Sequence, residues 1–287
     1  MADFVIITDS SCDLPTDKIA EYGIKVASLE LNIEGVGTVL NHEINPKEAY
    51  AYLRDKKGIK TAAVNMDKFC ELFESELAIG NDVLYLGFSS GLSATFMSGK
   101  NAAIDLSEKY PERKIIAIDT LCASLGQGLL VTLACRKKEE GATIEEVAQF
   151  VEETKLHLCH WFTVDDLFFL KRGGRISAAT AIVGTMLAFK PVLHVDNEGH
   201  LINVTKVRGR RASIAALLEK MKESAINPEN QTVYICHGDC YDDAKLLADM
   251  ITEEFGITDI LIDFTGPVIG AHSGPGTLAL FYIGTER

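Results

Sequence analysis

The chain has 287 residues, of which 47% are hydrophobic, so it can form two modest domains or one large α/β domain with a substantial core. Its formal net charge of −13 disfavours nucleic acid and anionic membrane surfaces as partners. The odd number of scattered cysteines, seven, is unlike a secreted disulfide scaffold and predicts reduced thiols in a cytoplasmic protein. The N-terminal residues do not resemble a signal peptide, and no apolar run approaches the roughly 20 residues that span a bilayer.

Short β-branched runs alternate with longer amphipathic segments through the first half of the chain. This rhythm predicts an α/β fold with a mostly parallel sheet flanked by helices. Asn45 and Asn65 are predicted to cap helices, and Thr143 with Glu146 forms a capping box. We predict strands at 4–8, 24–31, 82–88 and 114–119, and helices from about 16, at 46–54, 66–77 and 94–109, from 123 and from 144.

The pattern changes from Trp161, where we expect a second α/β domain with a mixed sheet. The predicted domains are therefore 1–160 and 161–287, and the absence of a Pro-rich linker favours close packing between them. The apolar segment 177–189 predicts a buried helix, either core or one wall of an apolar ligand cavity. Further elements are predicted as two strands within 191–207, a helix at 210–223, a strand at 232–237, a helix at 241–255, and strands at 258–264 and 278–284.

Residues 87–91 read Gly-Phe-Ser-Ser-Gly, which fits the G-x-S-x-G pattern of a nucleophile elbow between a strand and a helix. A hydrolase of that type has the chain order nucleophile, acid, histidine, and Ser89, Asp239 or Asp263, and His272 follow it. The order is weak evidence, because 41 acidic residues nearly always supply one between a serine and a histidine. Four hydroxyl residues in a run of seven also exceed what one activated nucleophile requires.

The same stretch also fits an anion cradle. A strand that turns at glycine into a helix brings unpaired backbone N–H groups and the positive end of the helix dipole to one point. Hydroxyls in the first turn add donors without adding charge, and such a site would hold a carboxylate or phosphate at the carboxyl ends of parallel strands. The remaining alternative is that Ser90 and Ser93 only cap the helix.

Three other segments carry polar groups. The segment TDSSCDLP at 8–15 is most simply cap and turn chemistry, because its two acids disfavour an anion. CHGDC at 236–240 lacks the second ligand pair of a zinc site, and we predict no metal. The Gly- and Pro-rich run 265–277 predicts a loop that fixes His272, which either bonds to its own loop or donates to an anion.

A basic cluster stands out in this acidic chain. It is either a solvated helix start or a docking patch for an acidic partner or a phosphate. Its members are Lys206, Arg208, Arg210 and Arg211, joined by Lys171, Arg172 and Arg175.

Taken in order, these motifs resemble the DegV family of bacterial fatty-acid-binding proteins. The resemblance covers almost the whole chain, and its seven pieces occur in the family's order. They are TDSSCDLP, Thr61 after a short loop, SSGLSATF, DTLCASLGQGLLV, LKRGGRIS, KVRGRRAS and IGAHSGPG.

The resemblance implies a two-domain α/β protein that binds one long-chain fatty acid such as palmitate, with its tail in an apolar tunnel. It implies no enzyme activity, catalytic residue, cofactor or metal in this chain; a separate ATP-dependent kinase subunit would phosphorylate the carboxylate. The implied carboxylate ligands are Thr61, Ser93 and His272, with helix N-terminus contacts at Ser90 and Ala94. The implied kinase-docking residues are Arg172, Arg175, Arg208, Arg210 and Arg211.

Two departures from the family pattern surround the implied head-group site. The family commonly has Ser-Gln-Pro after the threonine, whereas this chain has Ala62-Ala63-Val64, and Ala94 stands where a glycine is common. Both hydroxyls remain, but the polar groups and backbone beside them change. The alternatives to a kinase-linked carrier are an acyl hydrolase with Ser89 as nucleophile and His272 as base, and a lipid-binding regulatory sensor.

Overall fold

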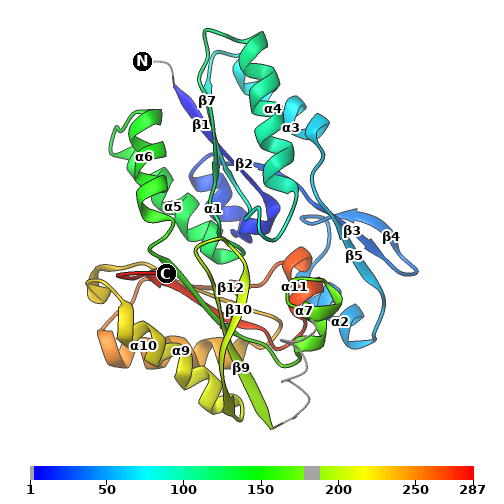
Figure 1. Cartoon of the computed structure of the whole chain (residues 1–287), viewed down its shortest axis with the longest axis vertical. Helices are drawn as coiled ribbons and strands as arrows, with labels where there is room; N and C mark the ends of the chain where they lie inside the picture. The colour runs from blue at the N-terminus through cyan, green and yellow to red at the C-terminus, as the bar shows by residue number, and fades with distance from the viewer. Residues whose placement is uncertain (1–2, 178–187) are drawn as a thin grey trace.

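The computed structural model describes residues 3–177 and 188–287, and these form two α/β halves stacked along the long axis of the molecule (Figure 1). The N-terminal half is built on a four-stranded parallel sheet, here sheet A, with strand order β2-β1-β6-β7. Its parallel pairing confirms the predicted α/β class. The strands are β1 (Phe4–Asp9), β2 (Lys25–Ala27), β6 (Asp82–Gly87) and β7 (Ile115–Asp119).

The helices of the N-terminal half follow the predicted caps. Asn45 and Asn65 accept backbone N–H groups from the first turns of α2 and α3, and Thr143 and Glu146 complete the capping box of α6. Alternate residues of β1 point to opposite faces of sheet A, one covered by α5 and α6 and the other by α3 and α4. The helices are α1 (Thr16–Glu21), α2 (Pro46–Arg54), α3 (Met66–Leu77), α4 (Thr95–Lys109), α5 (Leu125–Glu139) and α6 (Ile144–Thr154), with a 3₁₀ turn, η1, at Ser10–Cys12.

The single strand predicted at 24–31 is wrong, because the chain changes sheets within it. The Leu29 N–H is bonded to the Ser10 hydroxyl at 2.9 Å, and this bond separates β2 from the next strand. That next strand belongs to a small antiparallel sheet, sheet B, with order β4-β3-β5, which was not predicted. Sheet B comprises β3 (Glu30–Ile33), β4 (Gly37–Leu40) and β5 (Ile59–Ala62).

The C-terminal half is built on a six-stranded mixed sheet, sheet C, with order β10-β9-β8-β13-β11-β12, in which only β11 and β12 pair in parallel. Strand β8 was not predicted, and the expected boundary between residues 160 and 161 falls inside it; we propose that this boundary precedes β8. Its strands are β8 (Leu158–Thr163), β9 (Phe189–Val195), β10 (Leu201–Arg208), β11 (Val233–His237), β12 (Ile260–Phe264) and β13 (Leu278–Ile283).

Helices α9 (Arg210–Ser224) and α10 (Tyr241–Phe255) cover one face of sheet C, and α7 (Leu167–Arg172) follows β8. The segment expected to be a loop contains α11 (Pro267–Ser273), which corrects that prediction. Pro267 is the first helical residue, where its missing N–H costs nothing and its φ suits a helix. A 3₁₀ turn, η2, spans Pro228–Asn230. The buried helix predicted at 177–189 lies mostly outside the described residues.

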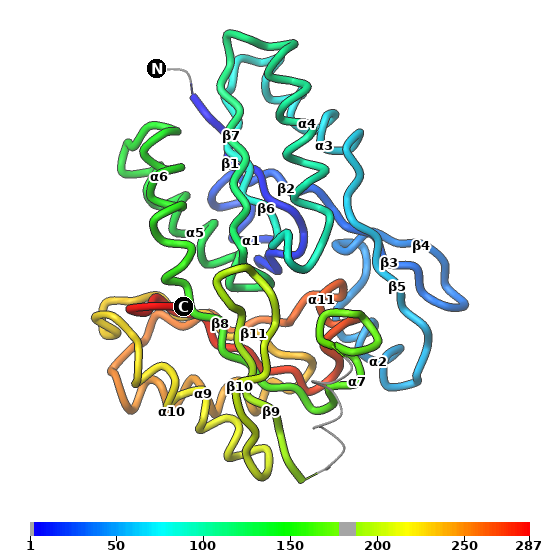
Figure 2. The backbone as a smooth tube through the Cα atoms, viewed as in Figure 1, coloured from blue at the N-terminus to red at the C-terminus, as the bar shows by residue number. Residues whose placement is uncertain are grey.

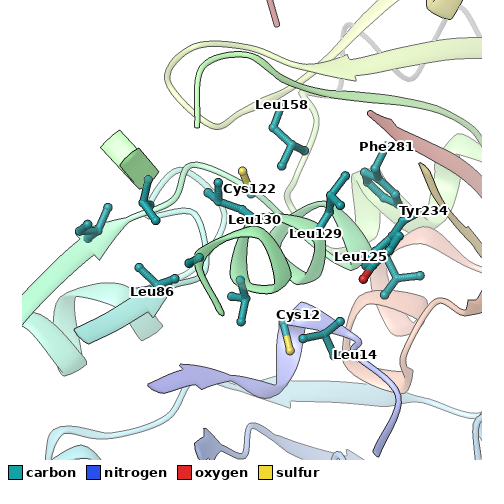
Figure 3. Close-up of a cluster of buried hydrophobic side chains, with 14 of the residues drawn as sticks. Cys12, Leu14, Leu86, Cys122, Leu125, Leu129, Leu130, Leu158, Tyr234 and Phe281 are labelled. Atoms are coloured by element: carbon teal, nitrogen blue, oxygen red, sulfur yellow. The ribbon is translucent and has the colours of Figure 1, made fainter. Parts of the chain in front are cut away.

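Helix α5 lies between the two main sheets, and its apolar side chains form the centre of the largest core cluster (Figure 3). Gly126 and Gly128 let its backbone approach both halves. A Cβ at 126 would lie 2.2 Å from Nε2 of His160 on β8, and one at 128 would lie 2.7 Å from the carbonyl oxygen of Cys12. A larger side chain at 126 would force the halves apart, and one at 128 would push α5 away from the segment that follows β1.

The turn between β9 and β10 reaches from sheet C to the N-terminal half (Figures 1 and 2). The hydroxyl of Ser89 donates a hydrogen bond to the carbonyl oxygen of Gly199 at 2.9 Å. Gly91 lies against the same turn, since a Cβ there would be 2.9 Å from the carbonyl oxygens of Glu198 and Gly199. The hairpin therefore forms a second junction between the halves.

Gly199→Ala tests this junction. A Cβ at 199 would lie 2.1 Å from the Ser89 hydroxyl, and the residue also has φ +79°. Gly256→Ala is the matched control, because Gly256 has φ +72° but no atom within 4 Å of its Cβ position. We expect the control to lose about 1–2 kcal/mol through left-handed strain. Gly199→Ala should lose about 1–3 kcal/mol more through overpacking. Urea unfolding measures both, and equal losses would contradict the close contact.

Candidate functional site

A cavity of about 190 Å³ lies between the two halves, and most of its wall is apolar. Side chains from sheet C, α11, α7 and the loop before α4 all contribute to it. The apolar members of the wall are Leu29, Ala63, Phe88, Leu92, Ala94, Ala123, Phe162, Leu170, Val195, Leu201, Val268, Ile269, Ala279 and Phe281. Such a wall suits a hydrocarbon ligand.

One face of α11 lines the cavity. Val268 and His272 are four residues apart, as are Ile269 and Ser273, and all four line the space. This spacing puts them on one side of the helix. The two residues nearer the N-terminus of α11 are apolar and the two at its C-terminal end are polar, so the cavity has an apolar region and a polar end.

Two hydroxyls and an imidazole meet at the polar end. Thr61 Oγ1, at the end of β5, lies 2.8 Å from His272 Nε2. Ser93, before α4, accepts the Thr95 N–H at 3.2 Å, and its Oγ lies 2.9 Å from Thr95 Oγ1. If the Thr95 hydroxyl donates to Ser93, both hydroxyls of that pair have a partner and the Ser93 hydrogen is free to donate to a ligand.

Two arginines contribute positive charge near this end. Arg175 donates to the carbonyl oxygens of Leu92, at 3.1 Å, and Gly173, and burial lowers the pKa of its guanidinium. Burial, with smaller contributions from Arg175 and Arg172, lowers the pKa of His272 to about 4. His272 is therefore neutral at physiological pH, with one nitrogen that donates and one that accepts.

The polar end is also the exposed end. Ala63 and Ala94, beside Thr61 and Ser93, are exposed, whereas His160 and Phe281 are buried. Strand β13 begins five residues after α11 and carries Ala279 and then Phe281 into the protein. Because residues two apart on a strand face the same side about 6.5–7 Å apart, Phe281 marks the deep end of the cavity.

The polar side chains deeper in the cavity bond to protein groups. The His160 ring packs edge-on against Phe281, with Nδ1 3.0 Å from the Leu158 carbonyl oxygen and Nε2 accepting the Ala123 N–H at 3.3 Å. The hydroxyl of Ser124 donates to Asp13. The deep walls can therefore contact a hydrocarbon without leaving these groups unpaired.

Asp13 is a buried acid near the cavity. Burial raises the pKa of its carboxyl to about 7, against the opposing effect of the bond from Ser124. It lies behind Ser124, and the Cys236 thiol beside that hydroxyl has its pKa raised by burial to about 12. Ser124 and Cys236 line the cavity, and the Asp13 carboxyl lies behind them.

Ser89 and His272 have different partners. The Ser89 side chain is fully buried under the hairpin turn, donates to Gly199 and accepts the Gly91 N–H at 3.2 Å. Ser89 does not line the cavity. Of the candidate acids, Asp239 pairs with Arg54 on α2 and Asp263 accepts its neighbour's N–H. The nucleophile, acid and base that the chain order suggested are therefore not joined.

The remaining sequence candidates separate into paired and exposed groups. Ser90 is exposed, its N–H bonds to Asp119, and it does not line the cavity, whereas Ala94 does. Arg210 is bound to Asp243 at 2.8 Å. Arg172, Arg208 and Arg211 are exposed. Arg175 is half-buried at the cavity.

Residues 3–177 and 188–287 show neither a metal site nor a membrane-spanning helix. No group of three or more His, Cys, Asp or Glu side chains in that part of the chain is arranged to hold a metal ion. The two acids of TDSSCDLP have structural partners: Asp9 caps η1 and accepts the Phe88 N–H at 2.9 Å, and Asp13 accepts from Ser124. No described helix has both the length and the apolar character needed to cross a bilayer.

Three cavity residues were not identified, or were given another role, from the sequence. His160 lies in the unpredicted β8, Ser273 lies in the unpredicted α11, and Arg175 was assigned only to docking. The four-residue spacing from Ile269 to Ser273 was the available signal for Ser273, but the surrounding glycines and prolines favoured a loop.

Comparison with known proteins agrees with this architecture. A family model described as "Uncharacterised protein, DegV family" matches residues 3–285. A DegV domain-containing protein of Clostridium perfringens is 44% identical, with 100% of this chain and 99% of the relative aligned. Another from Lactococcus lactis is 34% identical, with 98% and 97% aligned.

Solved structures give the same result. A DegV family protein from Thermus thermophilus, described for its fatty-acid binding, is 30% identical with a TM-score of 0.87 over 99% of this chain and 100% of that one. DegV from Bacillus subtilis, described as a fatty acid binding protein, is 25% identical with a TM-score of 0.87 over the same shares. The fold is thus common to all three chains.

The lowered pKa of His272 predicts how the free energy of unfolding depends on pH. Between its folded value of about 4 and the ordinary 6.5, the unfolded chain binds the proton more readily than the folded one. The contribution of neutral His272 to the free energy of unfolding is therefore complete above pH 6.5 and is lost as the pH falls toward 4. The free energy of unfolding falls by up to about 1.4 kcal/mol per pH unit in this range.

His272→Gln should flatten this part of the profile, because glutamine does not titrate. Urea unfolding at a series of pH values from neutral to acidic measures the difference between the two proteins. His200→Gln, on the exposed hairpin turn, controls for the loss of a histidine as such. Superimposable profiles for wild type and His272→Gln would contradict a buried, neutral His272.

Proposed function

This chain belongs to the DegV family, and from that premise we propose that it binds one long-chain fatty acid in the cavity between its halves. The observation that carries the proposal is the form of the cavity, whose wall is mostly apolar, with buried Phe281 toward one end and uncharged hydroxyls beside exposed Ala63 and Ala94 at the other. The fatty-acid binding described for the Thermus thermophilus and Bacillus subtilis proteins supports it. The protein would carry its lipid in the cytoplasm.

The carboxylate binds between Thr61 and Ser93. With the proton of neutral His272 on Nε2, the imidazole donates to Thr61 Oγ1 and leaves the threonine hydroxyl free to donate to the carboxylate. The Ser93 hydroxyl donates from the opposite element. Ala94 begins the first turn of α4, whose positive dipole end adds a favourable field for the anion.

The acyl tail extends toward His160 and Phe281. Each buried methylene adds about 0.8 kcal/mol, so the tail provides most of the affinity and the hydroxyls fix the orientation. The deep wall gives the tail no unpaired polar atom to cover, because His160 and Ser124 already bond to protein groups. Ala63, in one of the two departures from the family pattern, places a methyl group at the mouth and not a polar side chain.

The protein presents its ligand to an ATP-dependent fatty-acid kinase subunit. In that reaction a carboxylate oxygen attacks the γ-phosphorus of ATP, the bond to the bridging oxygen breaks, and ADP leaves as acyl phosphate forms. The exposed polar end leaves a carboxylate oxygen accessible to a partner. Of the basic residues expected to dock that partner, Arg172, Arg208 and Arg211 are exposed, whereas Arg210 is ion-paired and Arg175 faces the cavity.

Lipid binding is tested first by solvent extraction and mass spectrometry of the purified protein, then by hexadecanoate titration. Thr61→Ala and Ser93→Ala should each weaken binding about 10- to 100-fold, the value of one hydrogen bond to a charged group. Ser90→Ala, an exposed serine of the same loop, should bind as wild type does. The absence of any co-purifying or loadable fatty acid would reject the proposal.

The same purified proteins can distinguish the fatty-acid carrier from an acyl hydrolase and from a regulatory sensor. Labelling of Ser89 by a fluorophosphonate, with ester turnover lost in Ser89→Ala, would favour an acyl hydrolase. Lipid binding without acyl-phosphate formation in the presence of the organism's fatty-acid kinase subunit would favour a regulatory sensor.

Docking is tested with the double variant Arg208→Glu/Arg211→Glu. Reversing two exposed charges should lower the rate of acyl-phosphate formation at least about tenfold at low salt and leave hexadecanoate affinity unchanged, because rim charges act mainly on association. Lys100→Glu, at an exposed position of α4, is the matched control. An unchanged rate in the double variant would exclude this surface from docking.

A further inference from the structure

Ser273 has a buried hydroxyl without a hydrogen-bond partner among the described residues. The residue is only 5% exposed and lines the cavity. A buried hydroxyl without a partner is unfavourable by about 1–3 kcal/mol, so such groups in native proteins usually serve a ligand or a water molecule.

Within the described residues, the backbone of α11 does not form a hydrogen bond with this hydroxyl. A serine in a helix often donates to the carbonyl oxygen four residues earlier, here that of Ile269, but this bond is not formed in the part of the chain described. Thr277 also lines the cavity, but its hydroxyl donates to the Gly274 carbonyl oxygen at 2.7 Å. Of these two cavity hydroxyls, Ser273 is the one left for a ligand.

The position of Ser273 places its hydroxyl at the polar end. It follows His272 directly, lies on the same cavity-facing side of α11, and comes after the apolar residues Val268 and Ile269. His272 in turn bonds to Thr61. Ser273 is thus next to the group that orients the first proposed carboxylate ligand.

We propose that the Ser273 hydroxyl is a third donor to the ligand carboxylate, alongside Thr61 and Ser93. This inference rests on the proposed function and deepens it. A carboxylate has about four lone-pair sites on its two oxygens, so three donors leave one site open for attack on a phosphorus atom. A methylene of the tail has no acceptor, and therefore only the head group satisfies this hydroxyl.

Ser273→Ala, assayed with two ligands of equal length, tests the assignment. Hexadecanoate and hexadecanol share the tail but differ in the carboxylate. We expect Ser273→Ala to weaken hexadecanoate binding about tenfold or more and hexadecanol binding less than about threefold, because charge-assisted hydrogen bonds are the stronger ones. Thr277→Ala removes a cavity hydroxyl that is already bonded, and should leave the ratio of the two affinities unchanged.

Stability measurements separate a ligand role from a structural one. Unliganded Ser273→Ala should unfold at the same or a higher urea concentration than wild type, because the change removes an unpaired buried hydroxyl. Equal losses for both ligands, or a marked loss of stability, would overturn the assignment, as would unchanged hexadecanoate affinity. Failure of the wild type to bind hexadecanoate would instead reject the proposed function itself.

Discussion

The close packing of α5 between the two main sheets is the constraint on which the rest of the structure depends. A helix that contacts two sheets must be apolar on nearly all sides, and α5 meets this requirement with leucines around its axis (Figure 3). Gly126 and Gly128 remove the side chains that would otherwise hold the sheets apart. The resulting close approach of the two sheets brings β8 and β13 of one half opposite Phe88 and Leu92 of the other. These residues enclose the cavity.

The cavity separates two kinds of interaction along its length. At the deep end, polar side chains such as His160 and Ser124 are satisfied by the protein and leave an apolar surface. At the exposed end, the Ser93 hydroxyl bonds to Thr95 with a hydrogen available to donate, and the Ser273 hydroxyl has no partner among the described residues. The proposed ligand, with an apolar tail and one anionic head, would match both regions, and only one orientation would keep its charge out of an apolar environment.

The polar end offers neutral hydrogen-bond donors and no arginine clamp among the described residues. Arg175 lies at the cavity, but its guanidinium bonds to backbone carbonyl oxygens and does not extend as a bidentate clamp. Burial together with this cation keeps His272 neutral. In the proposed function, neutral hydroxyl donors would orient the carboxylate without the strong charge pairing that would lower the reactivity of its oxygen toward phosphorus.

Local patterns and motif order were enough to predict most of the strands and helices, the caps at Asn45, Asn65 and Thr143, and the family. The remaining features depend on tertiary contacts. The pairing of Thr61 with His272 joins residues 211 positions apart. The change of sheet at Leu29, the strand β8 and the helix α11 depend equally on distant partners. Local propensity cannot encode such contacts, since their energy arises only when α5 has brought the two halves together.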